Sequence, residues 1–402
     1  MRLTTVVAAL TLAGCASIDS GGGLPGGSGS SSGIPGIPGS TPGGVTDSTP
    51  PRPPTWPELD EATRRQRLAK LLPATLRDRQ AWANDLHAAF VHLQIPHEPT
   101  IYCAVLAITE QESGYQANPA VPGLGKIAWK ELTERAGRYG IPGLVLEAAM
   151  LKSSADGRSY RQRIDALKTE KEMSDLYEEM IALIPFGRQL FADFNPVRTG
   201  GPMQVSIDFA EKQARERGYP YPVGKSIRDE VFSRRGGLYF GTAILLDYPA
   251  PYDDVVYRFA DFNAGRYSSR NAAFQAAVAL LSNRPLARDG DLLRYRKGQP
   301  LPEASSVESA LRTLNGRLRL SDNEVRRDLL LEKAAEFGDS VLFKRVFALA
   351  DQAAGKRLPR QTMPEIDLKS PKITRKLTTE WFARRVEGRF KSCLGRVDAT
   401  AG

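Results

Sequence analysis

The chain has 402 residues and a formal net charge of +9, and this length can bury the core of one large domain or two small ones. The basic balance suits anionic partners such as nucleic acid, anionic lipid or a cell-wall polymer. His87, His92 and His97 are five residues apart and do not share a helix face, and no Gly-rich phosphate loop occurs, so we expect no metal site and no cofactor.

Residues 1–14 are typical of an export signal. Arg2 precedes the apolar run "LTTVVAALTLAG", which is too short to cross a bilayer as a helix. The end of this run, "LAGC", resembles the lipobox of bacterial lipoproteins. That resemblance implies cleavage before Cys15, lipidation of its thiol and, because Ala16 follows, an address at the periplasmic face of the outer membrane. An exported chain with an ordinary cysteine is the alternative, and export in either form argues against nucleic acid as a partner.

Residues 15–57 are rich in Gly, Ser and Pro, as in "GGGLPGGSGSSSGIPGIPGSTPGG". Such a composition cannot bury a core and predicts a flexible linker. A random coil of about forty residues has an end-to-end distance of roughly 35 Å. A domain on this linker could therefore work away from the membrane surface.

From Trp56 onward the pattern is mostly helical, with few strand signals, and predicts an all-α fold. Pro99 occupies a first-turn position and opens a helix that continues to Glu112. The Gly-rich stretch "TGGPMQVS" leads into a further helix. Other expected helices span 77–93 and 236–249, and residues 255–281 read as helix, Gly-containing turn and helix.

Cys103 and Cys393 remain once Cys15 is assigned to the lipid. In an oxidising compartment they could form a disulfide that joins the C-terminus to the helix from Pro99. Two unpaired cysteines fit equally well, because Cys103 lies in an apolar helix, where cysteine often packs as a small hydrophobe.

Two carboxylates near the end of the same helix are separated by helical phase. At 100° per residue, Glu112 falls within about 20° of Ile101 and continues the apolar stripe, whereas Glu110 points the opposite way. We therefore expect Glu110 to be solvated and Glu112 to be partly dehydrated at the margin of the core. Dehydration raises the pKa of a carboxyl group, as the general acid of glycoside cleavage requires. The alternative is that the helix frays at Ser113 and leaves Glu112 solvated.

Three short stretches together carry a resemblance to a known family. "ESGY" resembles the E-S-x-F/Y motif of lytic transglycosylases with the goose-lysozyme-like fold, "GPMQ" resembles their G-L-M-Q, and "FNAG" resembles their A-Y-N-A-G. The stretches occur in the family's order, with the apolar helix "GGLYFGTAILL" between the last two. The resemblance covers about 75–120 and 199–285.

The resemblance implies a peptidoglycan substrate and an all-α, lysozyme-like core. Glu112 matches the glutamate that acts as general acid and then as general base, which gives a 1,6-anhydromuramyl product without water. Glycan strands are then the expected partner. The positions that match substrate-binding or acid-shaping residues of the family are Ser113, Tyr115, Met203, Gln204, Phe262 and Asn263.

The chain departs from the family pattern in length and at two positions. Far more residues separate "ESGY" from "GPMQ" than the family usually has, so we expect a helical insertion over 120–198 within a catalytic domain over 58–300. Residues 301–402 form an expected helical extension without a counterpart. Pro202 replaces a leucine, and Phe262 replaces a tyrosine whose hydroxyl is then missing near Glu112.

Two other functions stay open at this point. A hydrolytic muramidase on the same fold would need a second carboxylate to activate water, and Asp261 and Asp193 are the candidates. Asp261 is equally well explained as a solvated residue at a helix end. The chain could also be a lipoprotein that binds peptidoglycan without cleaving it.

Overall fold

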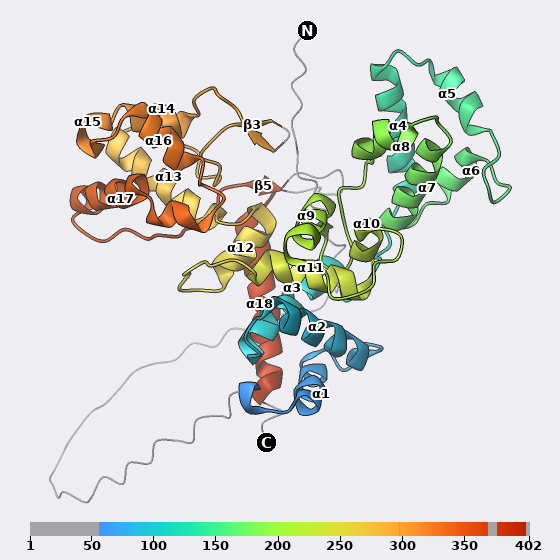
Figure 1. Ribbon diagram of the computed structural model, residues 1–402, viewed down its shortest axis with the longest axis horizontal. Coiled ribbons are helices and arrows are strands. Elements are labelled where there is room, and N and C mark those ends of the chain that lie inside the picture. The colour runs from blue at the N-terminus through green and yellow to red at the C-terminus, as the bar shows by residue number, and fades with distance from the viewer. Residues whose placement is uncertain (1–55, 297, 369–375, 399–402) are drawn as a thin grey trace, which may run out of the picture.

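Helices form most of the computed structural model, which describes residues 56–296, 298–368 and 376–398 (Figure 1). The expected all-α class is confirmed. The strands in these ranges are two residues long and pair as antiparallel hairpins: β1 (Thr199–Gly200) with β2 (Val205–Ser206), β3 (Tyr295–Arg296) with β4 (Gln299–Pro300), and β5 (Asp367–Leu368) with β6 (Leu377–Thr378).

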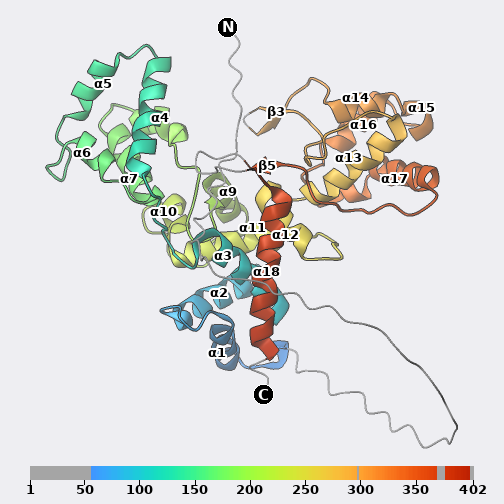
Figure 2. The same ribbon diagram turned by 180° about the vertical axis from the view of Figure 1, so that it is seen from behind.

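A central body contains the first and the last helices of the described chain. Its largest apolar cluster is built around α3 and α11, and the C-terminal helix α18 packs against α3 and α12. Figure 2 shows α18 beside both of these helices. The elements of the body are η1 (Trp56–Glu58), α1 (Glu61–Leu71), α2 (Arg79–Leu93), α3 (Pro99–Ser113), α9 (Ile207–Arg217), α10 (Ile227–Val231), α11 (Arg234–Leu246), α12 (Val256–Ala264) and α18 (Thr379–Asp398).

The helices predicted around the motifs are present. Pro99 is the first residue of α3, where its missing N–H costs no hydrogen bond, and Gly114 ends the helix in the left-handed region at φ 57°. The helix predicted over 77–93 is α2, and the buried helix predicted over 236–249 is α11. Gly265, at φ 108°, separates α12 from the helix that follows, as predicted.

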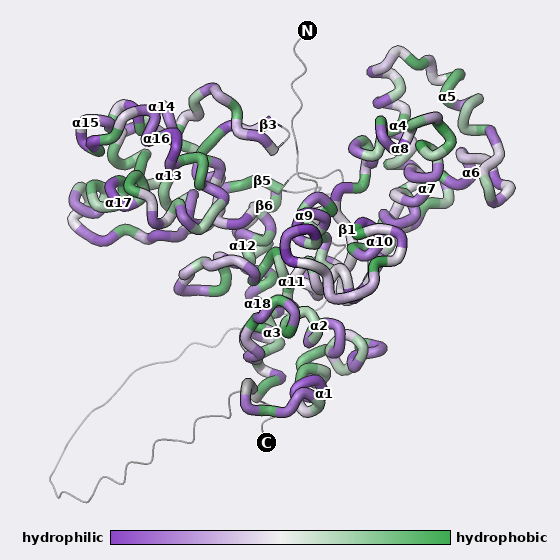
Figure 3. The backbone as a smooth tube through the Cα atoms, in the orientation of Figure 1, coloured by the Kyte–Doolittle hydropathy of each residue, from purple (hydrophilic) through white to green (hydrophobic). Residues whose placement is uncertain are grey.

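The segment expected as an insertion forms a separate lobe with a small apolar cluster of its own around Tyr160, Ile164 and Leu176. Many of its large apolar side chains are nevertheless exposed, among them Leu144 at 81% and Phe186 at 76%. The tube in Figure 3 is correspondingly hydrophobic along α5. The lobe comprises α4 (Leu124–Arg138), α5 (Gly143–Met150), α6 (Tyr160–Asp165), α7 (Glu170–Ala182), α8 (Gly187–Phe191) and η2 (Ala192–Phe194).

A second lobe has an apolar cluster that draws on both sides of residue 300. It begins with α13, inside the expected catalytic domain, and ends with α17, after which the chain returns to the central body as α18. The expected boundary at 300/301 is therefore wrong as a division of the fold. The lobe comprises α13 (Ser268–Ser282), α14 (Ser306–Arg312), α15 (Asn315–Leu318), α16 (Asp322–Leu329), η3 (Ala335–Asp339) and α17 (Val341–Ala354).

A disulfide joins Cys103 of α3 to Cys393 of α18, across a sequence separation of 290. Of the two states left open by the sequence, the structure therefore has the paired one. Within the described ranges, no helix combines the length and apolarity needed to cross a membrane. Of the linker expected over 15–57, residues 15–55, including Cys15, lie outside these ranges. Trp56 begins η1 and is buried in the central cluster, so the expected linker end at residue 57 is wrong.

Candidate functional site

The three stretches "ESGY", "GPMQ" and "FNAG" contribute side chains to one cavity of about 500 Å³. Glu112 comes from the end of α3, Gln204 from the β1–β2 hairpin, and Phe262 and Asn263 from α12. Residues of α9 and the start of α13 complete its walls. The structure thus gathers four of the seven residues predicted for catalysis or substrate binding.

Glu112 is the buried acid of this cavity. Its side chain is 4% exposed, and its Oε2 has no hydrogen-bond partner among the described residues. Burial raises the pKa of Glu112 to about 8, because the carboxylate loses water and gains no compensating partner. The last turn of α3 does not fray, so the alternative of a solvated Glu112 is wrong. At neutral pH the side chain is a proton donor.

Glu110 differs from its prediction. It is partly buried rather than freely solvated, because α18 covers that side of α3 and places Arg389 Nε 3.6 Å from Glu110 Oε1. The helical phase correctly separated the two carboxylates, but it contained no information on the helix that packs there. Glu110 therefore ties α3 to α18, and Glu112 faces the cavity.

Gln204 is held in position by its neighbours on both sides. Its backbone lies in the left-handed region at φ 49°, and its Oε1 accepts a hydrogen bond from Thr199 Oγ1 at 3.3 Å. Its Nε2 is 3.5 Å from Oε2 of Glu170, a buried residue at the start of α7 in the inserted lobe. The insertion thus contacts a cavity residue directly. Glu170 belongs to none of the motifs, so its position beside the cavity was not predicted from the sequence.

Met203 packs under the hairpin and does not line the cavity. A Cβ at Gly241 of α11 would lie 2.3 Å from Met203 Sδ, and a Cβ at Gly237 would lie 2.2 Å from Pro202 Cδ. Both glycines therefore permit the hairpin to approach α11 closely. Pro202, the departure from the family's leucine, fills the space over Gly237. The predicted sugar contact by Met203 is wrong because its side chain is fully buried.

Ser113 and Tyr115 also lie outside the cavity lining. Ser113 Oγ donates to the carbonyl of Thr109 at 3.1 Å and accepts from the N–H of Gln116, so it ties the end of α3 to the turn that follows. Tyr115 donates its hydroxyl to the carbonyl of Leu106 at 3.1 Å. Both residues shape the end of the acid's helix, and neither presents a group to a substrate in this cavity.

Asn263 is oriented by the C-terminal helix. Thr379, the first residue of α18, donates its hydroxyl to Asn263 Oδ1 at 2.9 Å. This bond fixes which end of the amide accepts and leaves the Nδ2 group as a donor for the cavity. Thr379 is 116 residues away in sequence, and no pattern pointed to it.

Asp261 is neither solvated nor a free base. The residue is 1% exposed, and burial raises its pKa against the lowering effect of its hydrogen bonds. Its Oδ1 accepts the N–H of Ser269 at 2.7 Å, and its Oδ2 accepts the N–H of Tyr267 at 2.8 Å and the hydroxyl of Tyr252 at 2.6 Å. Through these hydrogen bonds Asp261 stabilises the turn between α12 and α13. Asp193, the other candidate base, is an exposed residue outside the cavity lining.

Basic side chains also line the cavity. Lys212, Arg266 and Lys333 are among its lining residues. Arg266 Nε donates to the carbonyl of Ile244 at 3.1 Å, so it is fixed, whereas Lys333 pairs with Asp291 at 3.5 Å. Within the described part of the chain, no group of His, Cys, Asp and Glu side chains has the arrangement of a metal site.

Comparison with known proteins places the chain in a family. A family model described as "Protein of unknown function (DUF1615)" matches residues 75–396. The chain belongs to this family. A relative from Escherichia coli (strain K12), described as "Uncharacterized protein YaiW", is 50% identical over 323 residues, which cover 80% of this chain and 87% of the relative. No solved structure matches the chain.

Proposed function

We propose that this protein is a peptidoglycan lytic transglycosylase with a lysozyme-like core. The observation that carries the proposal is Glu112: a carboxyl group that burial keeps protonated at neutral pH, in the wall of a cavity that also presents the amides of Gln204 and Asn263. A general acid needs a pKa near the working pH, and a sugar cleft needs a few fixed donors and acceptors.

In the proposed reaction, Glu112 gives its proton to the oxygen that bridges N-acetylmuramic acid and N-acetylglucosamine. The bond from that oxygen to C1 of the muramyl residue breaks, and the N-acetylglucosamine leaves with the proton as a free hydroxyl. The Glu112 carboxylate then takes the proton of the muramyl C6 hydroxyl while its oxygen bonds to C1. The 1,6-anhydro ring closes, Glu112 is protonated again, and no water is consumed.

The single-carboxylate route is supported by the state of the other carboxylates near Glu112. Two of them that line the cavity, Glu216 and Asp291, pair with Lys212 at 3.9 Å and with Lys333 at 3.5 Å. An inverting hydrolase needs a second carboxylate that is free to activate water across the sugar ring. Asp261 has both oxygens engaged by hydrogen bonds, and Glu170 is bound to Gln204 outside the cavity lining. Neither is placed as a free base.

We further propose that a lipid on Cys15 anchors the protein at the periplasmic face of the outer membrane, where glycan strands are within reach of the linker. The proposal rests on the "LAGC" segment alone. The intact mass of the protein isolated from membranes tests this proposal. The mass should include the lipid and should lack residues 1–14.

The proposed reaction is tested on purified peptidoglycan by mass spectrometry of the released fragments. The parent protein should release 1,6-anhydro products, and Glu112→Gln should lower that release by several orders of magnitude. Glu110→Gln, on the same helix, is the matched control and should retain activity. Fragments with reducing muramic acid would instead indicate hydrolysis. Glycan binding without release of fragments by the parent would identify a binding protein.

A further inference from the structure

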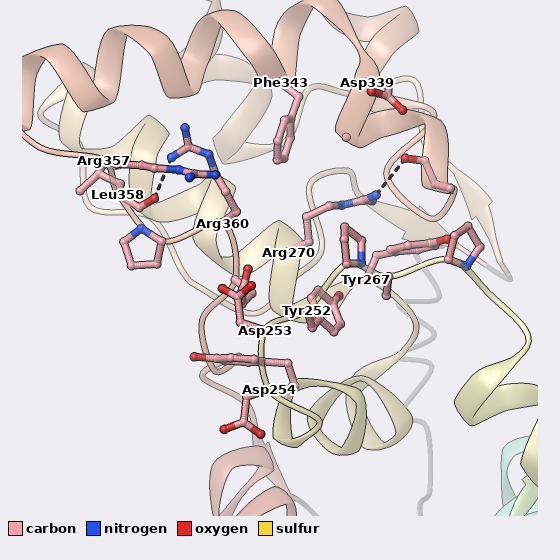
Figure 4. Close-up of a pocket in the computed structure, with 18 residues that line it drawn as sticks. Tyr252, Asp253, Asp254, Tyr267, Arg270, Asp339, Phe343, Arg357, Leu358 and Arg360 are labelled. Atoms are coloured by element: carbon pink, nitrogen blue, oxygen red, sulfur yellow. Dashed lines mark hydrogen bonds between the residues drawn. The ribbon is translucent and has the colours of Figure 1, made fainter. Parts of the chain in front are cut away.

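A second and larger cavity, of about 1290 Å³, lies where the central body meets the second lobe. Its walls are the loop that follows α11, the start of α13, η3 and α17, and the segment that follows α17. Figure 4 shows Phe343 reaching into it from one side and Tyr252 and Tyr267 from the other. No motif used above contributes to this cavity.

The two cavities share a wall, the turn between α12 and α13. Along this stretch the side chains alternate: Arg266, Ser268 and Asn271 line the Glu112 cavity, whereas Tyr267 and Arg270 line the larger one. Asp261 accepts the hydroxyl of Tyr252, so a residue that lines one cavity is hydrogen-bonded to a residue that lines the other. The larger cavity therefore lies directly behind the candidate active site.

Most polar groups in the larger cavity are already committed to holding its walls. Arg270 donates to the carbonyls of Ala334 at 2.9 Å and Glu332 at 2.6 Å. Arg360 binds both carboxylate oxygens of Asp351, at 3.0 and 2.7 Å. These contacts fix the cavity's shape without filling it.

Asp339 of η3 also lines the cavity, and it pairs with Lys344 at 3.3 Å. The charged groups that then remain have opposite signs on opposite walls. Arg357 lines the cavity and forms no hydrogen bond or ion pair with any described residue. Across from it lie two acids (Figure 4). Asp253 uses one oxygen to accept from Gln361 at 2.9 Å, and Asp254 uses one to accept the N–H of Val256 at 2.9 Å, so each carboxylate keeps one oxygen without a hydrogen bond from the described part of the chain.

The aromatic rings and the opposite charges of this cavity together discriminate between classes of ligand. A neutral saccharide would use the ring faces of Tyr252, Tyr267 and Phe343 but would carry no charged group to pair with Arg357. A short peptide that carries a carboxylate and an ammonium group would engage both walls and cover the rings between them.

We propose that the larger cavity binds short zwitterionic peptides, which in the polymer named above are the stem peptides attached to muramic acid. Recognition of the peptide would thus occur on one side of the turn between α12 and α13, and cleavage would occur on the other side, where Phe262 and Asn263 of α12 line the Glu112 cavity. The choice of stem peptides rests on the proposed function, whereas the cavity and its charges do not.

The experiment is calorimetric titration of the full-length protein with a purified stem peptide that contains no sugar. Arg357→Gln should weaken binding by about tenfold, as expected for loss of one charge-assisted contact. Asp254→Asn keeps the acceptor for the N–H of Val256 and removes the charge, and it should weaken binding similarly. Lys356→Gln is the matched control, because this exposed neighbour does not line the cavity. It should bind like the parent, and so should Glu112→Gln.

Several results would overturn the proposal: no binding of the peptide by the parent, equal binding by Arg357→Gln and Asp254→Asn, or equal binding of a peptide whose amino and carboxyl groups are blocked. Displacement of the peptide by a chitin oligosaccharide in the Glu112→Gln background would assign the cavity to sugar instead. Failure of the lytic reaction is seen separately, in the fragment assay, because peptide binding requires no turnover.

Discussion

Replacing Glu112 by glutamine should change how the stability of the folded protein depends on pH. Burial raises the pKa of this carboxyl group from an ordinary 4.5 to about 8. Between these two values the unfolded chain has lost the proton and the folded chain has kept it. The free energy of unfolding of the parent should therefore fall by about 1.4 kcal/mol per pH unit from this group, up to roughly 5 kcal/mol in total.

Glutamine has nearly the same shape and no charge, so the variant should lack this slope. The variant should become increasingly more stable than the parent as the pH rises from 5 to 8, and the difference should level off above pH 8. In a chain of this size about 1–2 °C of Tm corresponds to 1 kcal/mol, so the two Tm curves should separate by roughly 5 °C.

The assay is thermal unfolding followed by circular dichroism at matched ionic strength, with Glu110→Gln as the control. Contributions from all other titrating groups are common to the proteins and cancel in the difference. Glu110→Gln should follow the pH dependence of the parent, because it leaves the buried carboxyl group in place. Parallel Tm curves for parent and Glu112→Gln would refute the conclusion that Glu112 is held protonated.

Three further outcomes are expected. Fragment release by the parent should decline as the pH passes about 8, because Glu112 then loses the proton that the proposed reaction requires; a rate that keeps rising to pH 10 would contradict this. Cys393→Ser opens a loop of 290 residues and should lower stability by roughly 4–6 kcal/mol, measured as a lower Tm than that of the oxidised parent; an unchanged Tm would contradict it. Gly241→Ala places a methyl group 2.3 Å from Met203 Sδ and should lower the free energy of unfolding by about 1–3 kcal/mol, with a parallel loss of activity. Gly316→Ala is the control, because its methyl group would meet no atom within 4 Å.

The position of Glu112 could be derived from the sequence because a helix has a fixed period. The apolar side chains of "IYCAVLAI" define one face of α3, and counting from them places Glu112 in line with that face. The same reasoning located α2 and α11 and the turn at Gly265. The presence of Gln204 and Asn263 beside Glu112 was expected only from the resemblance, since nothing local in the chain relates residues so far apart.

The parts of the site that the sequence did not predict are long-range contacts. Thr379 orients Asn263, Arg389 pairs with Glu110, and Glu170 approaches Gln204, all through tertiary packing. None of these residues belongs to a pattern with a local physical meaning. Asp261 shows the same limit, because its hydrogen-bond donors come from two segments whose paths only the fold defines. The donors are the hydroxyls of Tyr248 and Tyr252 and the N–H groups of Tyr267 and Ser269.

The packing of α18 on α3 has a consequence for how the protein is made. The helix that carries Glu112 is synthesised early, but the helix that covers it and provides Cys393 is synthesised last. During synthesis, the surface of α3 that packs against α18 therefore stays uncovered until α18 has been made. Any truncation that removes α18 removes the cover of α3 and the disulfide partner of Cys103, so the surroundings of Glu112 are complete only once α18 has been made.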